Sequence, residues 1–109
     1  MAKTIQFTYE GTDYTLEFTR RTVGEMERDG FRISEIGDKP MTLLPQFFAG
    51  SFRAHHRNVK QSTIDSIYGR LPDKAMLLEK LVEMYNEPLA TLTDEPEDES
   101  KKVEWRADF

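Results

Sequence analysis

Two short runs near the start of the chain alternate between apolar and polar side chains. In residues 4–9 and 14–19 every second position is apolar, namely Ile5, Phe7, Tyr9, Tyr14, Leu16 and Phe18. This period of two is typical of a half-buried β-strand, and Gly11 lies among turn-forming residues between the two runs. The pattern predicts an antiparallel β-hairpin. Because an isolated hairpin is at best marginally stable in water, its apolar face must pack against another part of the chain.

From residue 22 onward the apolar positions recur at spacings of three and four, which is the period of an α-helix. A first helix is predicted to begin at Thr22, which forms a capping-box pattern with Glu25, and to end at Gly30. A second helix is predicted over residues 42–57, with Pro45 in its first turn and an apolar stripe made of Leu44, Phe47, Phe48, Ser51, Phe52 and His55.

Two further helices follow in the pattern. The third is predicted over residues 62–69, with Ser62 as its cap. The fourth is predicted to begin after Asp73, which serves as the N-cap, and to be the most apolar of the four helices. Because proline lacks an N–H and clashes with the preceding turn, Pro88 is expected to end or kink this helix near Asn86.

The predicted elements form one α+β domain over residues 1–92, with an N-terminal antiparallel β-hairpin packed against three to four α-helices. Residues 93–102 end this pattern, since they hold no apolar residue except Pro96 and carry five acids within six positions. Such a segment cannot bury enough surface to offset its ordering entropy, so a disordered acidic linker is predicted. Residues 103–109 then alternate like a strand, with apolar positions at Val103, Trp105, Ala107 and Phe109.

The charge of the chain is concentrated in its last part. The 109 residues contain 15 Lys and Arg and 20 Asp and Glu, for a net charge of −5. Residues 93–109 hold seven acids and three bases and so carry −4, whereas residues 1–92 hold 13 acids and 12 bases and carry −1. Affinity for phosphate depends on clustered Lys and Arg, so this balance argues against nucleic acid as the main partner.

Several chemical classes have no support in the sequence. The absence of cysteine excludes disulfides and thiolate metal sites, and no apolar run reaches the ~20 residues that span a bilayer. His55 and His56 are neighbours that a helix would point roughly 100° apart, which does not suit chelation of one ion. The chain shows no nucleophile motif and no glycine-rich phosphate loop. We therefore predict no catalytic residue, no cofactor and no metal.

The candidate contacts with a partner are aromatic. Phe47, Phe48 and Phe52 cluster on the second predicted helix, where they could form either the core or a partner surface. Trp105 and Phe109 lie beyond the acidic linker. For them three alternatives stay open, namely recognition by another chain, folding back as an extra strand on the hairpin edge, and disorder.

A basic group provides a weaker candidate site. Together with the two histidines it could bind phosphate, but its members are spread thinly over 18 residues: Arg53, Arg57, Lys60 and Arg70. A solvated face is the favoured interpretation.

The type and order of several short segments within residues 5–92 match those of a known protein family. The matching segments are FTYEG and YTLEFTR in the hairpin, then TVGEMERDG, ISEI with KP, FFAGSF with AHH, and LVEMYNEP in the helical part. They resemble the small tail assembly chaperones encoded by long-tailed bacteriophages and prophages of Gram-positive bacteria. The likeness carries no catalytic signature and fixes no binding residue.

The resemblance implies a role. A member of that family is a non-enzymatic chaperone in the cytoplasm of the bacterial host, where it binds the hydrophobic, helical tape measure protein and keeps it soluble until the tail tube assembles around it. The resemblance also implies a frameshifted longer form of the same chain, in which case the acidic linker and residues 103–109 could belong to the short form only. The longer form, the tail tube protein and self-association are further partner candidates.

Two alternatives to the chaperone role stay open at this point. One is a structural tail or head-completion protein that is retained in the virion. The other, less favoured by the charge balance, is a small nucleic-acid-binding regulator that would use the basic group.

Overall fold

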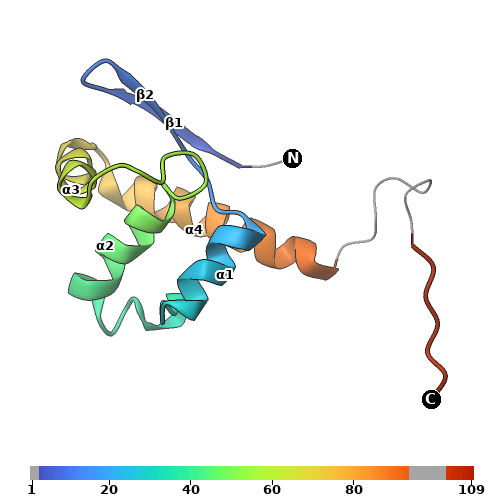
Figure 1. Ribbon diagram of the computed structural model, residues 1–109. Coiled ribbons are helices and arrows are strands. Elements are labelled where there is room, and N and C mark those ends of the chain that lie inside the picture. Colours follow the sequence, from blue (N-terminus) through green and yellow to red (C-terminus); the bar gives the residue numbers. More distant parts are fainter. Residues whose placement is uncertain (1–2, 94–102) are drawn as a thin grey trace.

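A β-hairpin followed by four α-helices makes up the fold (Figure 1), which confirms the predicted α+β class. The computed structural model describes residues 3–93 and 103–109. The strands are β1 (Ile5–Tyr9) and β2 (Thr12–Leu16), and the helices are α1 (Arg20–Arg28), α2 (Pro40–Gly50), α3 (Gln61–Arg70) and α4 (Lys74–Ala90), with 3₁₀ turns at Ile33–Glu35 and Thr91–Thr93. The predicted acidic linker lies outside the described residues, apart from Thr93.

The hairpin is closed by a tight turn. Tyr9 pairs with Thr12, so only Glu10 and Gly11 connect the strands, and both have positive φ, at 49° and 79°. Two central residues with positive φ define the turn type that matches the natural twist of a hairpin. The ladder runs antiparallel from this turn to the pair of Ile5 and Leu16.

Helix α1 begins earlier than predicted. Its N-cap is Thr19, whose Oγ1 accepts a hydrogen bond from the Thr22 N–H at 3.1 Å, while Thr22 Oγ1 accepts one from the Thr19 N–H at 2.9 Å. The capping box is therefore made by two threonines, and the placement of Thr22 as N-cap was wrong. Thr19 takes this position because its extended backbone continues directly from the hairpin into the helix.

The C-terminal end of α1 is a Schellman motif. Gly30 has φ +95° and donates its N–H to the Glu27 carbonyl, while Phe31 donates to the Met26 carbonyl. The prediction that Gly30 ends this helix is confirmed. The motif turns the chain so that Phe31 is buried in the core.

Helix α2 is displaced toward the N-terminus of its predicted range. It begins at Pro40, so that Pro45 lies inside it, and it ends at Gly50 instead of residue 57. Beyond Gly50 the amides of Ser51, Phe52 and Arg53 bond three residues back, as in a 3₁₀ turn. The helix cannot continue because the Ser51 carbonyl accepts a hydrogen bond from the Glu17 N–H at 3.0 Å instead of from its own helix.

The boundaries of α3 also differ from the prediction. Lys60 is the N-cap and makes no side-chain capping bond, and Ser62 lies inside the helix, where its carbonyl accepts from Ser66 Oγ. The predicted cap at Ser62 was therefore wrong, because the helix starts before it.

Helix α4 starts as predicted and ends later. The Asp73 carboxylate accepts from the Met76 N–H at 3.3 Å, which confirms the N-cap. The helix then continues through Pro88 to Ala90, so of the two predicted effects of Pro88, an end or a kink near Asn86, the end does not occur. Pro88 is buried and removes one N–H in the last turn only, and Arg20 from α1 donates to the Thr91 carbonyl just after the helix end.

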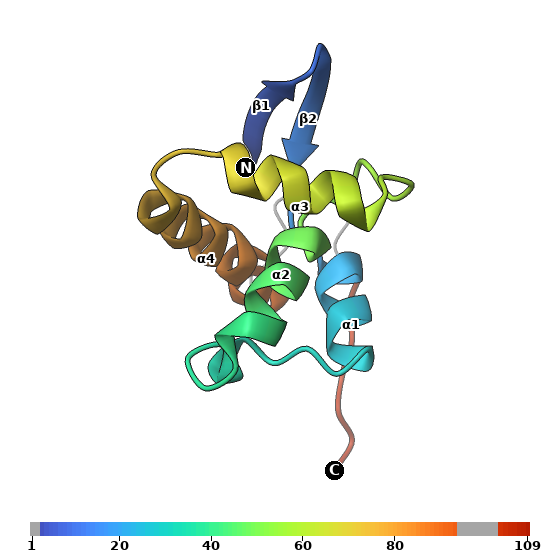
Figure 2. The same cartoon turned by 90° about the vertical axis from the view of Figure 1, so that its left-hand side faces the viewer.

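Aromatic rings join the elements in the core. The Phe47 ring on α2 lies 5.3 Å from Phe18, 5.7 Å from Phe31 and 5.6 Å from Tyr85 on α4, measured between centroids. These four rings come from four separate parts of the chain and hold them together. The helices surround this cluster, and the hairpin projects beyond α3 (Figure 2).

Close contact between α1 and α2 predicts a cost for any side chain at Gly50. A Cβ there would lie 2.5 Å from Met26 Sδ, and Met26 is itself buried. We expect Gly50→Ala to lower the free energy of unfolding by about 1–3 kcal/mol, as overpacking does in cores. The free energy is measured by urea denaturation.

Gly69→Ala is the matched control, because Gly69 is also helical but faces open space. It should raise the free energy of unfolding by about 0.5–1 kcal/mol, the usual gain of alanine over glycine in a helix. Adding Met26→Ala should make Gly50→Ala less costly. Equal effects of the two glycine substitutions would contradict the proposed contact.

Candidate partner-binding groove

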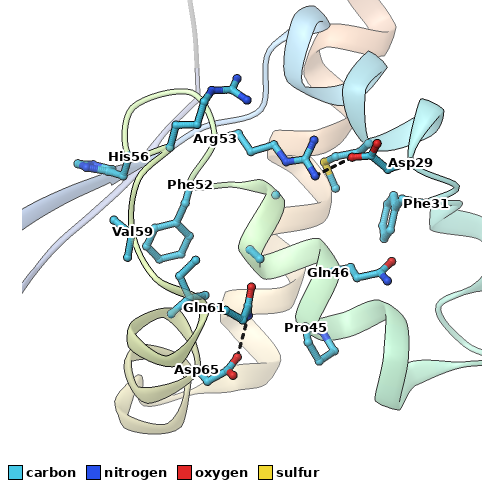
Figure 3. A pocket seen from close by; sticks show the side chains of 15 residues that line it. Asp29, Phe31, Pro45, Gln46, Phe52, Arg53, His56, Val59, Gln61 and Asp65 are labelled. Atoms are coloured by element: carbon cyan, nitrogen blue, oxygen red, sulfur yellow. Dashed lines mark hydrogen bonds and ion pairs between the residues drawn. The ribbon is translucent and has the colours of Figure 1, made fainter.

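A groove of about 720 Å³ lies between α1, α2, α3 and the connection that follows α2 (Figure 3). Its apolar lining comes from each of these segments: Met26, Phe31, Ala49, Phe52, Val59 and Ile64. Because α2 ends at Gly50, the chain turns away there and leaves space between the helices that a longer helix would fill. The groove is open, and its lining combines these apolar side chains, which could contact an apolar side chain or helix face, with polar ones such as Gln46, Gln61 and Asp65.

Charged side chains form one rim of this groove. Arg53 Nη2 lies 3.0 Å from the Asp29 carboxylate and Arg57 Nη2 lies 3.1 Å from that of Glu25 (the former pair is drawn in Figure 3). Arg21 and Arg53 also approach Glu25, each at 3.6 Å. Burial disfavours the charge on Glu25, but the hydrogen bond from Arg57 and the three guanidinium charges outweigh it, so the pKa of Glu25 is lowered.

The basic group identified in the sequence does not form one phosphate-binding cluster. Arg53 and Arg57 are paired with carboxylates on α1, and Arg70 lies over the Tyr9 ring at 5.8 Å. A guanidinium already paired with a carboxylate gains little from a phosphate. These contacts favour the interpretation of the basic residues as a structural rim.

The two histidines fasten the hairpin to the connection after α2. His56 Nε2 accepts a hydrogen bond from the Thr15 N–H at 2.9 Å, and its ring lies 5.0 Å from that of Tyr14. His55 Nε2 lies 2.7 Å from the Glu17 carboxylate. No acid occurs within four residues of His55 in the sequence, so this partner, 38 residues away, was missed by reading local spacing.

The predicted aromatic contacts separate into two groups. Phe47, Phe48 and Phe52 are buried in the core, and each exposes at most 2% of its surface. In this conformation their contribution to the surface is limited to the edge of Phe52 in the groove and the edge of Phe48 in a second hollow. Trp105 and Phe109, by contrast, are exposed, at 84% for Trp105.

A second, smaller hollow of about 260 Å³ lies between α2 and α3. Its lining is mostly apolar: Pro40, Met41, Leu44, Pro45, Phe48, Asp65 and Tyr68. Met41 is 90% exposed at its edge. The sequence pattern missed this residue because Met41 lay outside the predicted helix and its apolar stripe.

The described residues contain no group of three or more His, Asp or Glu side chains placed to hold a metal ion. What the arrangement provides is an apolar groove with a rim of paired charges. Both features are those of a surface that binds another chain or an apolar molecule.

The fold is a small α+β domain with an open groove between its helices. The chain belongs to the family described as "Domain of unknown function (DUF5055)", which matches it over residues 1–109. No curated protein and no solved structure gives a match. Within the part of the chain that the structure describes, no helix combines the length and apolarity needed to cross a membrane.

The His56 contact predicts that stability falls in mild acid. Burial, together with the charge of His55, lowers the pKa of His56 below its ordinary 6.5. The unfolded chain therefore binds a proton that the folded chain resists, and the free energy of unfolding decreases as pH falls below about 6.5 until the folded pKa is passed. Thermal or urea unfolding between pH 8 and pH 5 measures this decrease in the free energy of unfolding.

Substitution at the two histidines separates this effect from general acid unfolding. His56→Gln keeps an acceptor for Thr15 but cannot titrate, so its stability should vary less across this pH range. His55→Gln should retain the dependence, since His56 is still present. A profile for His56→Gln that matches the wild type would contradict the assignment.

Proposed function

We propose that the protein is a non-enzymatic tail assembly chaperone that binds the tape measure protein in the cytoplasm of the bacterial host. It keeps this hydrophobic, helical chain soluble until the tail tube is built around it. The proposal starts from the resemblance of residues 5–92 to such chaperones. The structural observation that carries it is the open apolar groove between α1, α2 and α3.

The groove suits the apolar face of a helix. Such a face presents side chains at spacings of three and four, and these could contact the apolar residues that line the groove. The charge pairs between α1 and the connection after α2 lie at the rim, where water remains. A partner can therefore bury apolar surface without stripping water from an unpaired charge.

Exposed methionines extend the apolar surface beyond the groove. Met41 is almost fully exposed beside the second hollow, and Met76 is exposed on α4. Methionine is flexible and polarizable, so it adapts to partners of varied shape. A chaperone for a long chain must accept many different helical segments, and such a surface fits that demand.

Co-expression tests the role. The tape measure protein from the same gene cluster is expected to stay soluble with this protein and to precipitate without it. Val59→Lys places a charge in the groove wall and should abolish the protection, whereas Asn58→Lys adds the same charge at an exposed neighbour outside the groove lining and should keep it. The soluble fraction is read by gel after centrifugation.

Two results would count against this proposal. If the tape measure protein is equally soluble alone, the chaperone role fails. If Val59→Lys protects as well as the wild type while its thermal unfolding is unchanged, the role survives but the groove is not the contact surface.

A further inference from the structure

The outer edge of β1 is an unpaired strand edge. The Thr15 N–H points out of the hairpin to His56, so Thr15 and its partner Gln6 do not bond to each other within the ladder. Pair types alternate along an antiparallel ladder, so Thr8 also turns its backbone N–H and C=O outward. No described residue supplies hydrogen-bond partners for these groups, and no described segment runs beside this edge in Figure 2.

One face of this edge strand is apolar and incompletely covered. Ile5, Phe7 and Tyr9 are each half-buried and alternate with exposed polar residues. Phe7 stacks on Tyr14 of β2, with 5.3 Å between ring centroids. A third strand with apolar residues at alternate positions would extend this face and cover Phe7 from its open side.

The chain contains a segment with that pattern. Val103, Trp105, Ala107 and Phe109 alternate with charged residues, and the Val103 and Trp105 side chains are more than four-fifths exposed. The segment has no helical or strand structure of its own. The described sheet consists of β1 and β2 alone, so residues 103–109 are not paired with the hairpin of their own chain in this structure.

We propose that residues 103–109 of one copy of the chain add to β1 of a second copy as an antiparallel strand. Gln6 lies opposite Arg106 and Thr8 lies opposite Glu104, and each of these two pairs exchanges backbone hydrogen bonds. Trp105 then lies opposite Phe7, which continues the stack of Phe7 on Tyr14.

Charge and ring stacking together select this register. A shift by two residues in one direction places Glu104 opposite Glu10, and like charges directly opposite are destabilising. A shift by two residues in the other direction places Trp105 opposite Ile5 instead of Phe7, so the stack on Phe7 and Tyr14 is not extended. In the chosen register the charged residues 104 and 106 face uncharged Thr8 and Gln6.

A hollow at the start of β1 fits the end of the added strand. It measures about 290 Å³ and is lined by Lys3, Thr4, Ile5, Lys80, Glu83 and Met84. Phe109 comes opposite Lys3 beside this hollow, where the apolar walls can take its ring. Asp108 comes opposite uncharged Thr4, on the other face of the sheet.

Exchange between two copies also closes the assembly. Each chain donates one segment and accepts one, so a two-fold axis relates the copies and covers both free edges. This interface uses β1, whereas the groove is lined by α1, α2, α3 and the connection after α2. The inference therefore does not rest on the chaperone role and can be tested without a tape measure protein.

Self-association of the full chain tests the proposal. Trp105 is the one tryptophan of the chain, so its emission reports on this segment alone. We expect a mass of two chains in sedimentation at high concentration. On dilution the mass should fall to one chain and the Trp105 emission should move to longer wavelength. Amide exchange should be slow at Gln6, Thr8, Glu104 and Arg106 in the dimer and faster after dilution.

Proline substitutions give matched variants. Gln6→Pro removes an N–H that the hairpin itself does not use, so it should raise the dissociation constant about tenfold, while Gln6→Thr keeps the N–H and should leave it unchanged. Arg106→Pro removes the opposite N–H from outside the folded domain. It should weaken the dimer even if Gln6→Pro disturbs the hairpin.

Three outcomes would overturn the proposal. The first is a single-chain mass at all concentrations with exposed Trp105. The second is a single-chain mass with shielded Trp105 and slow exchange at Gln6, which would mean pairing within one chain. The third is a dimer that neither Gln6→Pro nor Arg106→Pro weakens, which would place the interface elsewhere.

Discussion

The attachment of β2 to the connection after α2 sets the arrangement of the whole domain. Two backbone N–H groups form this attachment: that of Glu17 donates to the Ser51 carbonyl, and that of Thr15 donates to the His56 ring. A two-stranded hairpin cannot stand alone in water, and these bonds hold its apolar face against the helices. Because one acceptor is a main-chain carbonyl and the other an imidazole nitrogen, the attachment demands that α2 stop at Gly50 and that His56 stay neutral.

The same attachment creates the groove and decides which strand edge stays free. Since the Ser51 carbonyl serves the hairpin, the chain leaves the helix axis and carries Phe52 and Val59 to the groove wall, with Arg53 and Arg57 at its rim. A helix extended to residue 57 would instead have placed the arginines on a regular helix face. The outer edge of β2 makes this contact through Thr15 and the adjoining Glu17, whereas no described residue bonds to the outward amides of β1.

Local patterns predicted the element types well and their ends poorly. The sequence predicted the two strands from the alternation in residues 4–9 and 14–19, the end of α1 from Gly30 and the start of α4 from Asp73. Each of these features depends on residues only a few positions apart. The end of α2 depends on Glu17, and the continuation of α4 through Pro88 depends on burial and on Arg20 from α1. Both helix ends therefore depend on contacts between distant parts of the chain. Phe47 and Phe52 were identified as important, but periodicity alone does not tell core from surface.

Charge distribution is consistent with two separate surfaces on one small domain. Residues 1–92 are nearly neutral, and two of their acids, Glu25 and Asp29, pair with arginines at the groove rim. The excess of negative charge is in residues 93–109, which carry −4. In the proposed exchange Glu104 lies opposite Thr8 and Asp108 lies opposite Thr4, so these two acids lie along the free edge of β1. In the proposed chaperone role, the nearly neutral domain would meet an apolar helix in the groove, and the negative charge of residues 93–109 would oppose aggregation of the complex.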